Sequence, residues 1–192
     1  MPAMLDRRWT EREVRQLIED APMYGDRLEL VDGVLHVTPA PSRMHQRIIL
    51  ELVKPLDAFV RTRGIGELLL SPGDVRLAPE LVVQPDVYVV PGRNGRRAPA
   101  VAPVTQLLLA VEVLSPSTER FDRREKRMAY QSAGVPELWI VDATARTFER
   151  WRPHDEFAET LAASITWTPS GYDESLVLDI RDFFAEVSDD AP

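Results

Sequence analysis

The spacing of apolar residues changes several times along the chain, and each change predicts a new element. Apolar residues recur at three- and four-residue steps from 42 to about 63, which predicts a long amphipathic helix that contains Pro55, a residue that can kink it. A shorter helix is predicted over 10–20, where Thr10 has Glu13 three residues further on, as in a capping box. The segment 117–134 predicts a third helix, because it starts with possible Ser or Thr caps and ends at a glycine.

The other apolar segments predict strands. "RLELVDGVLHV" (27–37) alternates on both sides of Asp32-Gly33, a dipeptide typical of a two-residue hairpin turn. Further strands are expected on both sides of a turn in "GELLLSPGDVRLA" and over or near residues 82–90, 106–114, 137–142, 146–153 and 161–167, before a short helix near 179–187. This order predicts an α/β protein of the α+β type. We expect a central mixed sheet flanked by helices, with an N-terminal helix and β-hairpin, in a single domain over residues 1–192.

Two acidic residues interrupt the most apolar strands. "VVQPDVYVV" (82–90) carries Pro85 and Asp86 in its middle, and "LLLAVEVLSPS" (107–117) places Glu112 inside an apolar run. Alternate residues of a strand share a face, and both faces of the second strand are apolar, so it should be central and buried. A proline cannot donate to a sheet, so Pro85 indicates a strand that bulges or begins immediately before Asp86.

These acids need compensation, because a buried ionised carboxylate costs several kcal/mol unless it is paired or binds a metal. For either acid alone, a buried salt bridge or a neutral carboxyl is the simpler explanation. Two such acids on neighbouring strands favour another explanation, since close carboxylates repel and a divalent cation neutralises them. Oxygen ligands suit Mg²⁺ or Mn²⁺, so Asp86 and Glu112 together predict a site for one of these ions.

A lysine follows the second acid on the next predicted helix. Lys126 is one of only two lysines in the chain, and Asp122 and Tyr130 lie four residues before and after it, on the same face. The simpler interpretation is a solvated Asp-Lys pair, worth about 0.3–0.5 kcal/mol. The functional interpretation is that this face meets the two carboxylates. There a lysine can orient a water, stabilise charge on a phosphate or act as a base if its pKa is lowered.

Composition narrows the class of protein without identifying a substrate. The 192 residues are 44% hydrophobic and 28% charged, with no cysteine and no apolar run long enough to span a membrane. The chain starts with a charged segment that lacks a signal-peptide pattern, which predicts a cytoplasmic protein. The net charge of −8 argues against indiscriminate nucleic-acid binding, but residues 173–192 contribute −6 of it. Basic clusters at 93–97 and 120–127 therefore permit a polyanionic substrate.

The motifs around these residues follow a recognisable order. "QPD" (84–86) is followed by "VEVLSPST" (111–118), by the Asp122, Lys126 and Tyr130 stripe and by "GVPELWIVD" (134–142), while "LELVDG" (28–33) and "PAPSRMH" (39–45) lie upstream. Over about residues 24–152 this order resembles the Uma-two family, a large bacterial family of restriction-endonuclease-like proteins. That family is placed in the PD-(D/E)xK nuclease superfamily. The resemblance therefore implies a restriction-endonuclease-like core and an endonuclease that hydrolyses DNA with Mg²⁺ or Mn²⁺.

The resemblance also implies which residues act. Asp86 and Glu112 would be catalytic residues and metal ligands, the carbonyl of Val113 a further ligand, and Lys126 the third catalytic residue. The chain departs from the superfamily pattern at Leu114, where a lysine usually stands two residues after the second acid. In this family the lysine of the following helix takes its place, since its position in space matters and its place in the sequence does not.

Two more polar residues match positions that the family keeps, Glu29 and His45, and the resemblance implies supporting roles for them. On the sequence alone, Glu29 is an exposed acid on the hairpin. His45 precedes the apolar face of the long helix, where a histidine is more often packed and hydrogen-bonded than catalytic.

Three functions remain open on the sequence. The first is a magnesium-dependent endonuclease on DNA, whose backbone the arginines of the two basic clusters could contact, although a solvated surface explains them equally well. The second is a non-cleaving module on a nuclease fold that binds nucleic acid or a protein, which the pI of about 5.0 and the lack of a recognition module favour. The third is a metal-dependent hydrolase of a smaller phosphate ester. A homodimer is compatible with a nuclease that cuts both strands.

Overall fold

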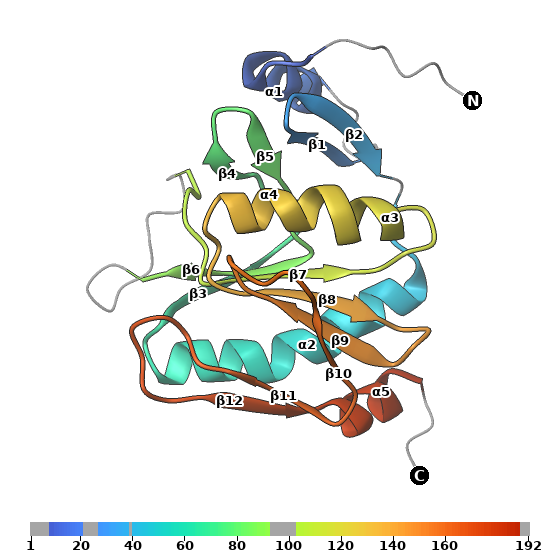
Figure 1. The fold of residues 1–192 in the computed structure, drawn as a ribbon, viewed down its shortest axis with the longest axis vertical. Coiled ribbons are helices and arrows are strands. Elements are labelled where there is room, and N and C mark those ends of the chain that lie inside the picture. Colours follow the sequence, from blue (N-terminus) through green and yellow to red (C-terminus); the bar gives the residue numbers. More distant parts are fainter. Residues whose placement is uncertain (1–7, 21–26, 39, 93–102, 189–192) are drawn as a thin grey trace.

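The structure is a computed structural model that describes residues 8–20, 27–38, 40–92 and 103–188 (Figure 1). Its helices are α1 (Glu11–Asp20), α2 (Arg43–Thr62), α3 (Glu119–Phe121), the π-helical turn η1 (Asp122–Lys126), α4 (Arg127–Ser132) and α5 (Ile180–Ser188). Its strands are β1 (Arg27–Val31), β2 (Val34–Thr38), β3 (Gly66–Leu70), β4 (Val75–Ala78), β5 (Leu81–Val83), β6 (Val87–Pro91), β7 (Leu109–Val113), β8 (Leu138–Asp142), β9 (Thr147–Trp151), β10 (Glu159–Leu161), β11 (Ser164–Trp167) and β12 (Leu176–Asp179). No helix among these residues is both long and apolar enough to cross a membrane.

A mixed sheet forms the centre of the molecule, as the sequence predicted. Its order is β10-β9-β8-β7-β6-β3, and β7 and β8 are parallel while the other neighbours are antiparallel. Parallel neighbours need a crossover connection, and here the helical segment α3, η1 and α4 supplies it. This crossover begins immediately after β7, the strand that carries Glu112, so the helix with Lys126 returns across the sheet beside that acid (Figure 1).

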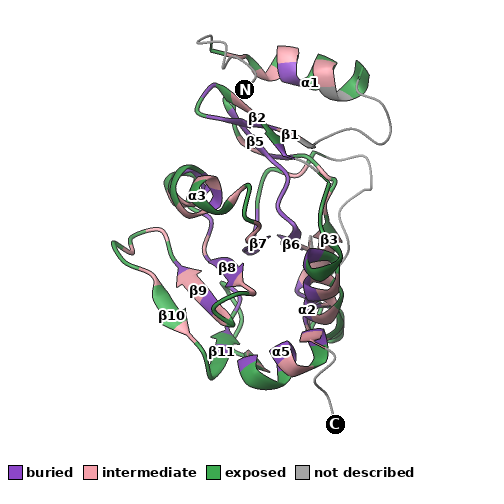
Figure 2. Ribbon diagram, turned by 90° about the vertical axis from the view of Figure 1, so that its right-hand side faces the viewer, coloured by how far each residue is buried: buried purple, intermediate pink, exposed green. Residues whose placement is uncertain are grey.

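Helices cover both faces of this sheet (Figures 1 and 2). On one face α2 and α5 pack against alternate residues of β7, Leu109, Val111 and Val113, in the larger apolar cluster. On the other face Ala129 and Tyr130 of α4 pack with Ala110 of β7. Glu112 belongs to this second face by strand alternation. The prediction that β7 is a central strand buried on both faces is therefore confirmed.

A second sheet, in the order β2-β1-β5-β4, stands beside the first and packs against α1 (Figure 2). It contains the predicted hairpin, whose turn places Asp32 and Gly33 at φ of 50° and 76°. The single strand predicted over 82–90 is wrong in one respect, because it is two strands: β5 belongs to the small sheet and β6 to the central sheet. Pro85 lacks the N–H that a continuous ladder would use, and the chain changes sheet at this point.

Three other elements differ from the sequence prediction. The strand expected near 161–167 is the end of β10 followed by β11, and β12, which pairs with β11, was not predicted. The strands expected on both sides of the turn in 66–78 are present, but β3 joins the central sheet and β4 the small one. The helix predicted over 117–134 is present from Glu119 to Ser132, with the wider turn η1 inside it. The terminal helix is present as α5.

Candidate active site

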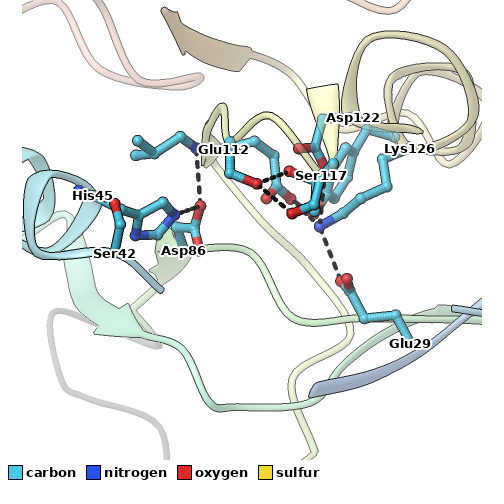
Figure 3. A network of polar contacts seen from close by, with 12 residues as sticks. Glu29, Ser42, His45, Asp86, Glu112, Ser117, Asp122 and Lys126 are labelled. Atoms are coloured by element: carbon cyan, nitrogen blue, oxygen red, sulfur yellow. Dashed lines mark hydrogen bonds and ion pairs between the residues drawn. The ribbon is translucent and has the colours of Figure 1, made fainter. Parts of the chain in front are cut away.

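The chain passes from the small sheet to the central sheet at 84–86, and this places Asp86 next to Val113, the last residue of β7. Asp86 is 2% exposed and lies immediately before the first residue of β6. Its Oδ2 accepts a hydrogen bond of 2.8 Å from the backbone N–H of Val113 and lies 3.0 Å from Nε2 of His45 on α2 (Figure 3). The carboxylate is thus held between the central sheet and one of the helices that cover it. This explains why an otherwise apolar segment contains a Pro-Asp step.

Glu112 projects from β7 towards the crossover helix. Its Oε1 lies 2.7 Å from Nζ of Lys126 and accepts a hydrogen bond of 2.6 Å from the hydroxyl of Tyr130. Burial raises the pKa of Glu112 to about 8, the Lys126 amine opposes this rise, and the nearby carboxylates add to it. Both contacts use Oε1, so Oε2 is the oxygen that remains for a ligand.

The Lys126 amine lies in a buried cluster of acids, and the interpretation of this residue as a solvated surface lysine is wrong. Its Nζ lies 2.9 Å from Oε1 of Glu29 as well as 2.7 Å from Glu112, and the whole residue is 1% exposed. Burial by itself would lower the pKa of Lys126, but the surrounding carboxylates outweigh it and raise that pKa. The amine is therefore a cation. Lys54, the other lysine, pairs with Glu51 on the surface of α2.

The π-helical turn η1 runs from Asp122 to Lys126 and buries both of these end residues. Single π turns inside α-helices are rare and are found frequently at functional sites. Oδ1 of Asp122 lies 3.9 Å from Nζ of Lys126, a looser contact than either glutamate makes. Burial raises the pKa of Asp122 to about 6, although Lys126 and the hydroxyl of Thr118 lower it. The sequence placed Asp122 on this face but gave it no role of its own.

Glu29 is the residue whose surroundings differ most from the sequence expectation. It is 1% exposed, so its interpretation as an exposed strand acid is wrong. Its Oε1 accepts a hydrogen bond of 2.7 Å from the backbone N–H of Gln84 in addition to its contact with Lys126. Glu29 comes from β1, so the small sheet contributes directly to a cluster centred on the large one. Only the need of the buried Lys126 for counter-charge could have suggested this contact from the sequence.

His45 behaves as a packed, hydrogen-bonded histidine, as the sequence suggested. It lies in the first turn of α2, where its backbone N–H donates to the hydroxyl of the cap residue Ser42. Its ring is buried, with Nε2 on Asp86, while Nδ1 has no hydrogen-bond partner among the described residues. The ring and the carboxyl group thus share one buried hydrogen bond. His45 therefore orients Asp86.

All of these side chains line one cavity of about 340 Å³. Its walls include the five residues singled out from the sequence, Glu29, His45, Asp86, Glu112 and Lys126, together with Asp122. Hydroxyl groups supply most of the remaining polar wall, from Thr38, Ser42, Ser115, Ser117, Thr118 and Thr144. Figure 3 shows these acids and the amine pointing toward one another from different elements. The structure thus brings together residues that lie almost 100 positions apart in the chain.

The donor set fits a hard divalent cation in charge and in atom type. Four buried carboxylates, of Glu29, Asp86, Glu112 and Asp122, face one buried amine, so the cavity has an excess of negative charge. Among the described residues, however, no three His, Asp or Glu side chains converge closely enough to hold a metal by themselves. Asp86 and Glu112 would need further oxygen ligands from the backbone, from water or from a substrate.

Apart from Lys126, the two basic clusters at 93–97 and 120–127 supply little positive charge to the described wall of this cavity. Arg93, Arg96 and Arg97 lie outside the described residues. Arg123 is engaged by carboxylates of three neighbouring segments, Glu119, Asp142 and Glu149, so its guanidinium is not directed at the cavity. Arg120 and Arg124 are exposed.

Comparisons with known proteins concern the fold and the family of the chain. A search of solved structures finds the crystal structure of a "putative nuclease belonging to DUF820" from Anabaena variabilis, with a TM-score of 0.71 and 21% sequence identity. The similarity covers 88% of this chain and 96% of that one, and at this identity it supports the fold alone. A search of curated proteins gives no match. The profile of the Uma2 (Uma-two) family, described as "Putative restriction endonuclease", matches residues 15–184. The chain therefore belongs to the Uma2 family.

Proposed function

We propose that this protein is an endonuclease that hydrolyses phosphodiester bonds in DNA with Mg²⁺ or Mn²⁺ held by Asp86 and Glu112. The observation that supports it is the convergence of these two carboxylates and Lys126 on one cavity, from three separate elements. Structural ion pairs alone do not require an acidic excess, whereas a cation site does. Membership of the Uma2 family agrees with a nuclease.

Each residue has a distinct part in this proposal. Asp86 and Glu112 would hold the ion, and the carbonyl of Val113 would be a further ligand. When bound, the ion polarises the scissile phosphate and lowers the pKa of a water. His45 and the N–H of Val113 fix the orientation of Asp86. Lys126 and Tyr130 hold Oε1 of Glu112, which leaves Oε2 for the ion.

Lys126 has fewer possible roles than the sequence left open. Its amine already lies within 3 Å of carboxylate oxygens of Glu29 and Glu112. An ammonium with these partners has no lone pair for a water proton, so it acts by position and by charge. We assign Lys126 the tasks of holding Glu112 and of supplying one positive charge near the phosphate.

Metal binding is tested first, by isothermal titration calorimetry with Mn²⁺ and Mg²⁺. Wild type should bind Mn²⁺, and Asp86→Asn and Glu112→Gln should each lower the affinity at least about tenfold. Asp57→Asn is the matched control, because Asp57 is a surface acid paired with Arg61 on α2. Equal Mn²⁺ affinity in all four proteins would contradict the proposed ligands.

Cleavage is then tested on supercoiled plasmid, circular single strands and branched DNA. Wild type with Mn²⁺ or Mg²⁺ should cut at least one of them, whereas Asp86→Asn and Glu112→Gln should be inactive. Release of phosphate from small esters without any cleavage of these polymers would instead indicate a hydrolase of smaller substrates.

A non-cleaving nucleic-acid- or protein-binding module is the second candidate, and one observation favours it. Lys126 is the only basic residue on the described cavity wall apart from His45, so this wall gives a phosphate backbone little attraction. DNA binding that weakens with salt but is unchanged in Asp86→Asn and Glu112→Gln, without cleavage by wild type, would support this alternative.

A further inference from the structure

A chain of hydroxyl groups leads from the protein surface to the acidic cavity. Oγ of Ser117 lies 3.0 Å from Oγ of Ser115, which lies 2.9 Å from Oγ1 of Thr118. The Thr118 hydroxyl in turn neighbours the carboxyl of Asp122 and lowers its pKa. Ser117 is exposed, Ser115 and Thr118 are half-buried and Asp122 is buried, so the chain runs along the cavity wall from the surface to the buried acid.

This chain of hydroxyl groups ends at Asp122, the buried acid whose contacts among the described residues are the weakest of the four. Asp86 and Glu112 form the proposed ion site, and Glu29 accepts from both Gln84 and Lys126. Within the described part of the chain, the Asp122 carboxyl has only the 3.9 Å approach of Lys126 and the neighbouring Thr118 hydroxyl. It lines the same cavity as the proposed ligands, so it can meet a water placed there.

The proposed reaction also needs a proton acceptor. Attack of water on a phosphodiester releases one proton, and Lys126, as an ammonium, cannot take it. A buried carboxylate whose pKa is near the working pH is an effective general base. Hydroxyl chains can conduct a proton in either direction, because each group both donates and accepts.

We propose that Asp122 is the proton acceptor of this site and that Thr118, Ser115 and Ser117 carry the proton from it to solvent. This inference rests on the proposed nuclease function. In the reaction, the O–H bond of the attacking water breaks, its proton moves to the Asp122 carboxylate and its oxygen bonds to phosphorus. The bond from phosphorus to the leaving oxygen breaks, and that oxygen takes a proton from solvent. One proton then passes along the three hydroxyls to bulk water, which restores the carboxylate.

Asp122 is surrounded by charged groups from several elements. Lys126 approaches it from its own helix, Glu29 from β1, Asp86 from the segment before β6 and Glu112 from β7. The acids favour the protonated form of Asp122, while Lys126 and the Thr118 hydroxyl favour the carboxylate. An added cation would also favour the carboxylate. The titration of Asp122 therefore reflects the whole cluster of charged groups.

The first test needs no activity. The carboxyl carbon of Asp122 is followed by NMR against pH in the full-length protein without divalent ions, with Asp122→Asn to assign the signal. Its midpoint should lie near 6. Thr118→Val should raise the midpoint by about one pH unit or more, because a hydrogen bond to the carboxylate is lost. Thr62→Val, which removes an exposed hydroxyl at the end of α2 outside the cavity, should leave the midpoint unchanged. A midpoint near 4, or no effect of Thr118→Val, would overturn the inference.

The second test is the pH dependence of single-turnover cleavage. In wild type the rate should rise with pH as Asp122 ionises. Asp122→Asn should lose this rising limb and about 100-fold or more of the rate, with Mn²⁺ affinity retained. Ser115→Ala should slow cleavage without a change in KM, and Thr62→Val should match wild type.

The outcomes separate the two proposals. If wild type cleaves and Asp122→Asn keeps both its rate and its pH profile, the role of Asp122 is wrong while the nuclease function stands. If wild type cleaves no DNA with either ion, the proposed function and the acceptor role both fall. An Asp122→Asn protein that loses Mn²⁺ affinity as well would show that Asp122 acts on the metal and not on the proton.

Discussion

The removal of the buried amine gives the sharpest test of the charge arrangement. Lys126→Met keeps the length and apolar stem of the side chain but leaves Glu29 and Glu112 without their cation. Both carboxylates lie within 3 Å of Nζ, and none of the three side chains is more than 2% exposed. Breaking a buried ion pair by removal of one partner costs about 3–5 kcal/mol. Burial raises the pKa of Glu112 to about 8, so this carboxyl is largely protonated at pH 7 and most of the cost falls on Glu29.

The assay is thermal and chemical unfolding at pH 7 in EDTA. For a protein of this size 1 kcal/mol corresponds to about 2–4 °C in Tm, so Lys126→Met should melt about 6–20 °C below wild type. Lys54→Met is the matched control, since it removes the only other lysine, whose side chain is 60% exposed beside Glu51. A surface pair of this kind is worth at most about 1 kcal/mol, so this variant should melt within about 4 °C of wild type.

A second substitution shows whether the loss comes from the unpaired charge. Glu29→Gln added to Lys126→Met removes one of the two stranded carboxylates, and it should restore at least about 1 kcal/mol. The reasoning fails if Lys126→Met and Lys54→Met unfold at the same temperature. That result would mean that the amine of Lys126 lies in solvent and that the cavity is not arranged as described.

Three further substitutions test other parts of the structure. The pKa of Asp122 is raised to about 6, so the folded protein loses stability as pH rises through the range from about 4 to 6. Asp122→Asn should remove this loss. Its free energy of unfolding in urea should exceed that of wild type by up to about 3 kcal/mol at pH 7, but by little at pH 3.5. Arg123→Ala should cost about 1–2 kcal/mol in the same assay, because it breaks contacts with three carboxylates, whereas the exposed Arg124→Ala should cost less than about 0.5 kcal/mol. Gly66→Ala should unfold the protein or strongly lower its Tm, because the added Cβ would lie 1.9 Å from the backbone oxygen of Val90, and a normal melting curve would contradict the β3–β6 pairing.

The sequence predicted the elements well where the signal is local. The capping box at Thr10 and the hairpin turn at Asp32-Gly33 depend on residues that are neighbours in the chain, and both are present. The long helix with Pro55 is also present, starting at the cap residue Ser42. The π turn at Asp122 to Lys126 was not predicted, because no residue type marks it.

Contacts between distant segments were harder to predict. Glu29 looks like one of many strand acids until Lys126 is placed beside it, because Glu29 belongs to the small sheet and Lys126 to the helical crossover of the central sheet. Pro85 indicated a bulge or a strand start within the apolar run from 81 to 91, but no local pattern showed that the two halves belong to different sheets. The register of β7 against β6 decides whether Asp86 and Glu112 share a cavity, and this depends on the whole sheet.

The candidate site and the fold have a common origin in the segment 84–86. A continuous strand there would place Asp86 in one sheet, with its side chain fixed by the ladder. The loss of one donor at Pro85 lets the chain leave the small sheet and enter the large one, and Asp86 occupies the junction. The N–H of Gln84 fixes Glu29, and the carboxylate of Asp86 binds His45 and Val113. A buried polar junction is stable only when its groups are paired, so these contacts hold the two sheets together. The same contacts gather more negative charge than one lysine neutralises, and that excess is the physical reason to expect a cation in this cavity.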